Sequence, residues 1–197
     1  MIEYIQHKYN WNQIEQSLIH WKGIEAAFRT YSEFRKTKII QLMYNWQHDG
    51  EQKKLFHPDA NEECPSKCGK CETHNHYLEC QDESMRRIRQ EKIRTVQHKL
   101  SQMNTHPLIK TTMIQMLTQS PENILQSMGE ASDDISKMVI TAIEENMHLS
   151  EFSFQKGFLS NKWHEAQTLW ARSLGTNKSK TQQHWGRDAI VCIQSYT

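Results

Sequence analysis

The 197-residue chain carries 24 Lys and Arg against 23 Asp and Glu, and a formal charge of +1 gives no global sign of a nucleic-acid-binding protein. No segment approaches the roughly 20 apolar residues that a membrane helix requires. The first ten residues lack the apolar core of a secretion signal. We therefore expect an intracellular protein, in the nucleus or cytoplasm, without a membrane partner.

Apolar residues recur at intervals of three or four along most of the chain, which predicts helices. The first such face consists of Trp11, Ile14, Leu18, Trp21, Ile24 or Ala27, and Phe28. Ser32 can cap a second helix. Residues 48–63 are polar and contain Gly50 and Pro58, so we interpret them as a linker.

Helix start signals are frequent in the second half of the chain. A long helix is predicted from about Asp82 to Met103, and Pro107 suits the first turn of the next one. Capping residues predict further helices, at Ser120-Pro121-Glu122, Ser132-Asp133-Asp134, Ser150 and Ser179. We expect a mostly α fold in which a small zinc knuckle is inserted, with a short β-hairpin at the metal site as the only sheet. The corresponding division is 1–60 for N-terminal helices and linker, 61–81 for the knuckle and 82–197 for a C-terminal helical region.

Four of the five cysteines lie between residues 64 and 80, with His74 and His76 among them. Thiolates and imidazoles are the ligands of tetrahedral zinc, and without an export signal metal binding is favoured over disulfides. His76 and Cys80 are spaced i and i+4, so they share a face if a helix begins there. Gly69 fits a sharp turn. Four protein ligands would leave no open coordination position, which indicates a structural ion.

The spacing leaves the ligand set open. One set is Cys64, Cys68, His76 and Cys80, and the other replaces Cys64 with Cys71, which lies one residue short of the retroviral nucleocapsid spacing. His74 could replace His76. The alternative without metal is a group of free or redox-active thiols.

The segment also resembles a known family. Cys64-Pro65, Cys68-Gly69, Glu72-Thr73, His76 and Cys80 resemble the zinc-binding segment downstream of the polymerase domain in non-LTR-type retroelement reverse transcriptases. The resemblance implies Cys64 as the first ligand, because the second family cysteine stands four residues before the Glu, as Cys68 does. This sequence departs from the family pattern in two ways: it has one extra residue between the first two cysteines, and it contains the additional Cys71.

Weaker similarities lie outside this segment, in His20-Trp21 and in the tryptophans at 163, 170 and 185. The family continues with a further helix where this chain ends, so the resemblance implies a fragment or a derived reading frame. It implies a non-catalytic protein that acts for a polymerase encoded elsewhere.

The residues themselves predict no catalytic site. Asp133-Asp134 lacks the aromatic residue and the strand that precede the paired aspartates of a polymerase, and it is typical of a helix start. No metalloprotease, phosphate-loop or nucleophile-elbow motif occurs. Cys192 is expected to be a small core residue. We expect that the chain is not an enzyme on its own.

Basic residues follow the cysteine cluster closely. Lysine and arginine side chains can lie along phosphates and an aromatic ring can stack on a base, and the candidates here are Arg86, Arg87, Arg89, Lys92, Arg94 and Tyr77. These residues make RNA or single-stranded DNA a candidate partner of the chain. The alternative is a solvated helix face in a zinc-stapled protein-interaction domain that binds no nucleic acid.

Overall fold

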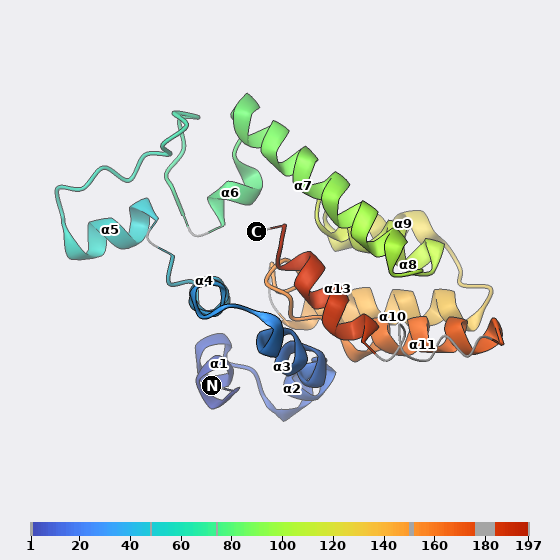
Figure 1. Cartoon of the computed structure of the whole chain (residues 1–197). Coiled ribbons are helices and arrows are strands. Elements are labelled where there is room, and N and C mark those ends of the chain that lie inside the picture. Colours follow the sequence, from blue (N-terminus) through green and yellow to red (C-terminus); the bar gives the residue numbers. More distant parts are fainter. Residues whose placement is uncertain (1, 48, 74, 150–151, 176–183, 197) are drawn as a thin grey trace. The chain divides into compact units, whose positions relative to one another are not determined.

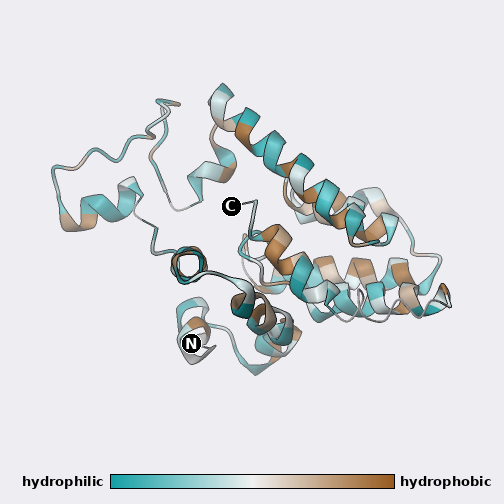
Figure 2. Cartoon of the chain, viewed as in Figure 1, coloured by the Kyte–Doolittle hydropathy of each residue, from teal (hydrophilic) through white to brown (hydrophobic). Residues whose placement is uncertain are grey.

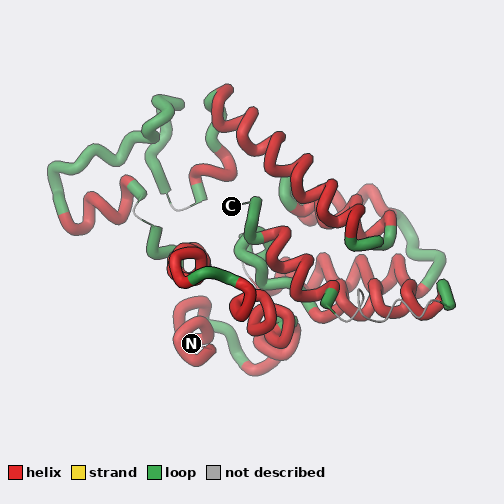
Figure 3. Tube along the Cα trace, in the orientation of Figure 1, coloured by secondary structure: helices red, strands yellow, loops and turns green. Residues whose placement is uncertain are grey.

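The protein is mostly helical. The computed structural model describes residues 2–47, 49–73, 75–149, 152–175 and 184–196 (Figure 1). Within these ranges Figure 3 shows helices and loops and no strand. Two isolated antiparallel bridges, Ile19 with Ser160 and Glu63 with Cys71, are the only strand-like pairings among the described residues. The mostly α class is confirmed, whereas the expected hairpin is reduced to a single bridge beside the cysteine cluster.

The chain folds as two compact units. One comprises residues 1–31 and 95–197, and the other comprises residues 32–94. These boundaries differ from the three consecutive segments inferred from the sequence. In the part of the chain that the structure describes, no helix has the length and apolar character needed to cross a membrane.

The first unit is built around two helix pairs. Helix α10 packs against α11, and α3 packs against α13. Its helices are α1 (Ile2–Tyr9), α2 (Gln13–Leu18), α3 (Trp21–Thr30), α8 (Pro107–Met116), α9 (Pro121–Met128), α10 (Asp134–Leu149), α11 (Asn161–Ser173) and α13 (Trp185–Ile193).

Tryptophans anchor this unit, as their number in the sequence suggests. Trp163 and Trp185 are fully buried, and each indole N–H donates to a buried side-chain oxygen. Trp163 donates to Asn146 at 2.9 Å, and Trp185 donates to Thr105 at 2.9 Å. Asn146 also donates to the Phe158 carbonyl at 2.6 Å. This single amide therefore joins α10 to the start of α11.

The second unit holds the cysteine cluster. Its helices are α4 (Glu33–Met43), α5 (Gly50–Phe56) and the one-turn α6 (His76–Glu79), and helix α7 (Glu83–Gln102) begins in this unit. In Figure 2, α7 is mostly coloured as hydrophilic, with a few apolar residues between the polar ones. Such a helix presents most of its circumference to water.

Most of the predicted helix starts are found. Ser32 and Ser120 accept hydrogen bonds from the N–H groups of Arg35 and Asn123, and Pro107 begins α8. Asp133 accepts from the Ser136 N–H at 3.0 Å, which confirms that Asp133-Asp134 opens a helix. Ser150 and Ser179 lie outside the described residues.

Candidate metal centre

The loop that carries Cys64 and Cys68 is a pair of tight turns. The Lys67 N–H donates to the Cys64 carbonyl at 2.8 Å, and the Cys64 N–H donates to the Lys70 carbonyl at 2.9 Å. Lys67 and Gly69 have φ values of 54° and 81°. Glycine adopts this left-handed region without a steric penalty, so Gly69 provides the sharp turn that the sequence predicted.

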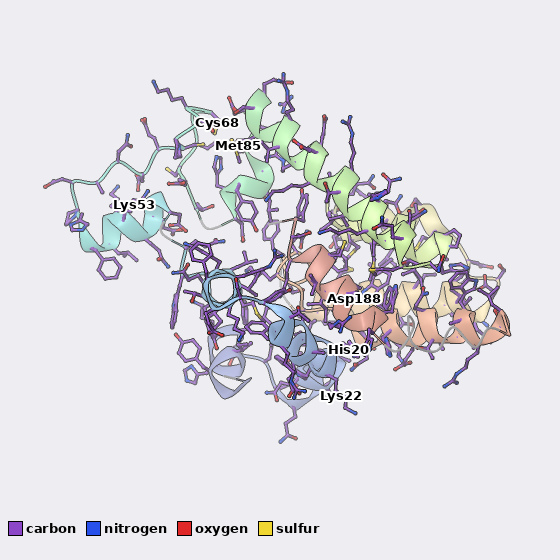
Figure 4. All side chains as sticks on the ribbon, in the orientation of Figure 1. His20, Lys22, Lys53, Cys68, Met85 and Asp188 are labelled. Atoms are coloured by element: carbon purple, nitrogen blue, oxygen red, sulfur yellow. The ribbon has the colours of Figure 1, made fainter. Side chains whose placement is uncertain are left out.

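Helix α6 and the residue that follows it supply the other two candidate ligands, His76 and Cys80. The Cys80 N–H donates to the His76 carbonyl at 2.7 Å, which closes one helical turn between them. The i and i+4 spacing therefore places His76 and Cys80 on one face, as predicted. Figure 4 labels Cys68 in the loop before α6 and Met85 in the first turn of α7.

The two pieces of chain bring four side chains together. The donor atoms of Cys64, Cys68, His76 and Cys80 all lie within 4.8 Å of one another, close enough to bind one metal ion. The Cys64 and Cys80 Sγ atoms are 3.7 Å apart, and Cys68 Sγ lies 3.2 Å from His76 Nε2. All of the cysteines are free thiols rather than disulfides.

These distances match a tetrahedral ion. Zinc–sulfur bonds of about 2.3 Å at tetrahedral angles place two sulfur atoms about 3.8 Å apart, and a sulfur and a nitrogen about 3.6 Å apart. The Cys64–Cys80 separation agrees with this value, and the Cys68–His76 separation is somewhat shorter. Three thiols and one imidazole in this geometry are typical of zinc.

The surroundings of Cys64 and Cys80 shift the pKa values of these two thiols in opposite directions. Burial opposes ionisation of Cys64, but hydrogen bonds from the Ser66 backbone and from His76, Cys68 and Cys80 lower its pKa to about 7. Burial raises the pKa of Cys80, and the neighbouring thiols act in the same direction. A metal ion must displace the protons of its thiol ligands, and Cys64 is the thiol that releases its proton more readily.

The fifth candidate ligand points elsewhere. Cys71 is exposed and pairs through its backbone with Glu63, outside the four-ligand group. His74 lies outside the described residues. Cys192 is buried in the first unit, where it donates to the Val96 carbonyl at 3.6 Å and burial raises its pKa to about 11. A buried, protonated thiol fits a packing role.

The candidate nucleic-acid contacts occupy different environments. Arg86, Arg87 and Arg94 are exposed on α7, whereas Arg89, Lys92 and Tyr77 are half-buried. Desolvation lowers the pKa of Lys92. Arg89 donates to the carbonyl oxygens of Tyr77 at 2.8 Å and of Cys80 at 2.5 Å.

Arg89 therefore has a structural contact that sequence reasoning missed. Its planar guanidinium offers a fork of donors, and here the fork spans two carbonyl oxygens at the end of α6. The only signal in the sequence was its spacing, because Arg89 stands nine residues after Cys80 on a helix that begins shortly after this cysteine. That spacing by itself does not distinguish a contact with the loop from a contact with solvent.

Residues 50–56 of the expected linker form helix α5, which supports the cysteine loop. The Glu51 N–H donates to the Glu72 carbonyl at 3.1 Å, and Lys54 forms an ion pair with Glu62 at 2.9 Å. Gly50 packs so closely against the backbone of Glu62 that a Cβ atom at position 50 would be 2.8 Å from it. The helix is thereby attached to the loop that carries the first two cysteines.

Comparisons with known proteins add no family to this picture: no family model, no curated protein and no solved structure matches the chain. The cluster geometry therefore carries the functional argument.

Proposed function

We propose that Cys64, Cys68, His76 and Cys80 bind one structural Zn²⁺, and that this zinc-containing protein is non-catalytic and engages RNA or single-stranded DNA through α7. The convergence of the four donor atoms within 4.8 Å carries the proposal. The similarity of the same four residues to the segment downstream of retroelement reverse transcriptases supports the nucleic-acid part.

A structural role follows from the ligand set. Four protein ligands complete a tetrahedron and leave no position for a substrate or a reactive water. Cys64, His76 and Cys80 are buried, so the ion would be shielded from solvent on most sides. A loop this short buries little apolar area, and an ion supplies the missing free energy of folding.

The exposed arginines of α7 support the nucleic-acid part. Arg86, Arg87 and Arg94 form no ion pair within the part of the chain that the structure describes. Arg87 and Arg94 are seven residues apart, which places them on one face of the helix about 10 Å from each other. Charges that are not neutralised by the protein are available to phosphates.

The test is binding of a fluorescent single-stranded RNA to zinc-loaded protein across a salt series. Each phosphate contact to a single strand contributes about 0.7 to the slope of log affinity against log salt. Arg87→Gln with Arg94→Gln should therefore reduce the slope by about 1.4. Arg29→Gln with Arg172→Gln removes the same charge from exposed positions on α3 and α11 and should leave the slope unchanged. Absence of wild-type binding at low salt would refute the nucleic-acid role.

A second function is favoured by one observation. Leu55 and Phe56, adjacent at the end of α5, are each 77% exposed. Neighbouring exposed apolar side chains are typical of a protein-interaction surface. In this alternative the zinc is a staple only, so the protein folds around the metal and shows no affinity for RNA in the salt series.

A further inference from the structure

A cavity of about 290 Å³ lies beside the metal ligands in the second unit. Cys64, His76 and Cys80 form part of its wall, and Asp49, Glu72 and Tyr77 form another part. Its volume is at the lower end of the range for ligand pockets, about 300 to 1,000 Å³. The space is therefore much larger than one ion and suits a single long side chain.

Asp49 has a buried oxygen that the fold does not use. The residue is only 6% exposed, and its Oδ1 accepts the Gln52 N–H at 2.8 Å, which caps α5. Its Oδ2 is also buried and has no hydrogen-bond partner among the described residues. Capping explains Oδ1 alone. A buried carboxylate oxygen without a donor is costly, and this one belongs to a residue that lines the cavity.

The charges around the cavity are negative. Asp49 and Glu72 line it, and no lysine or arginine is among the described residues that line it. Glu72 is partly neutralised by Lys53, at 3.7 Å, whereas no ion pair involves Asp49 within the described residues. With zinc bound, three thiolates give the centre a net charge of −1. A phosphate would be repelled here and a cation attracted.

We propose that this cavity binds the basic side chain of an arginine or lysine from a partner polypeptide, with Asp49 Oδ2 accepting a hydrogen bond from the cationic group. Pro65, Met85 and the Tyr77 ring line the same cavity and offer apolar surface to the methylene stem. This is a second binding site, separate from the arginines of α7 and opposite in charge. It relies on the proposed zinc only for the additional negative charge.

The experiment is calorimetric titration of zinc-loaded protein with three N-acetylated tripeptide amides, Gly-Arg-Gly, Gly-Lys-Gly and Gly-Gln-Gly. The arginine or the lysine peptide should bind, and the glutamine peptide should not. Asp49→Asn keeps an oxygen for the cap, because asparagine caps as well as aspartate, but removes the charge. It should weaken binding of the basic peptide by about tenfold or more. Asp133→Asn, the same change at the cap of α10, should have no effect.

Two outcomes would overturn the proposal. The first is equal affinity of the wild-type protein for the arginine, lysine and glutamine peptides, which needs no variant and so does not depend on how Asp49→Asn folds. The second is an Asp49→Asn protein that keeps its zinc and binds the basic peptide as the wild type does. Since RNA is absent from these titrations, the result stands apart from the salt series on α7.

Discussion

His20 and His164 form a half-buried imidazole stack in the first unit. Their ring centroids lie 4.7 Å apart and the rings are nearly parallel, and the Trp185 ring also stacks on His164 at a centroid distance of 6.3 Å. Room for the stack comes from Gly186, where a Cβ atom would be 2.5 Å from His20 Nε2. The pair therefore lies where the start of α3 meets α11 and α13, since His20 directly precedes α3, His164 is in α11 and Trp185 is in α13.

Burial lowers the pKa of both histidines below 6.5. The Asn161 hydrogen bond opposes the shift of His20 and Lys22 adds to it, while for His164 the nearby His20 adds to the shift and Glu165 opposes it. The unfolded chain then binds more protons than the folded one as the pH falls below about 6.5, so stability is lost toward acid.

We predict that acidification from about pH 7 to about pH 5 lowers the melting temperature and that His164→Phe makes this loss smaller. Phenylalanine keeps an aromatic ring in the stack and cannot be protonated. The measurement is the melting temperature against pH for both proteins, with the exposed His57→Phe as the matched control. An acid slope of His164→Phe equal to that of the wild type would show that the stack does not sense protons.

The candidate ligands differ in how well the sequence could predict them. His76 and Cys80 were predictable because a helical spacing of four fixes the relative direction of two side chains. Cys64 and Cys71 lie in an irregular loop, where no period fixes direction, so the spacing left both open. The structure brings Cys64 together with Cys68, His76 and Cys80 and leaves Cys71 exposed, so Cys64 is the better candidate ligand.

At the scale of elements, Arg89 joins α7 to α6. It donates hydrogen bonds to the carbonyl oxygens of Tyr77 and Cys80, and Cys80 is a candidate metal ligand. Such an outer contact fixes the direction of a ligand. The first turns of α7 thus contact the candidate metal centre and also present arginines to solvent.

We predict that Arg89→Gln lowers the free energy of unfolding by about 1.5 to 3 kcal/mol, the range for hydrogen bonds that involve a charged group. It should also speed the transfer of zinc to a competing chelator. Arg87→Gln, two residues away and exposed, should change neither quantity. Chemical denaturation and chelator kinetics measure both. Equal behaviour of the two variants would contradict the role assigned to Arg89.

Local start signals were more reliable than long apolar faces. Pro107, Ser120 and Asp133 begin their helices because a cap acts on its own first turn. The prediction of one continuous helix face from Trp11 to Phe28 was wrong, because the helix ends at Leu18 and Ile14 is 72% exposed.

The cause of this break lies far away in the sequence. Ile19 pairs with Ser160, and the His20 N–H donates to the Leu159 carbonyl at 2.9 Å. Helical periodicity reports local neighbours only, so it cannot show a pairing across more than a hundred residues.

At the scale of the whole molecule, the two units differ in what stabilises them. Residues 1–31 and 95–197 have a core with fully buried Trp163 and Trp185. In residues 32–94 the four donor atoms of the cysteine cluster converge, and the surrounding chain is held by Arg89 and by contacts with α5. The sequence suggested consecutive segments because it does not reveal that the first three helices belong with the C-terminal ones.

Removal of the metal should therefore act unequally on the two units. With a strong chelator, we predict that backbone amides of residues 64–80 lose protection from hydrogen exchange while those of α10 and α11 keep theirs. Exchange followed by mass spectrometry on the intact chain measures this directly. Equal loss in both units would show that the ion stabilises the entire protein, and no loss in either would show that the cluster needs no ion.

The most direct test of the central claim is a count of zinc ions per chain by native mass spectrometry, on reduced wild-type, Cys64→Ser and Cys71→Ser proteins. The cluster geometry predicts one zinc in the wild type and in Cys71→Ser, because Cys71 is exposed and outside the four-ligand group, and loss of zinc in Cys64→Ser. A wild type without metal, or zinc that is lost with Cys71 and kept without Cys64, would contradict the account.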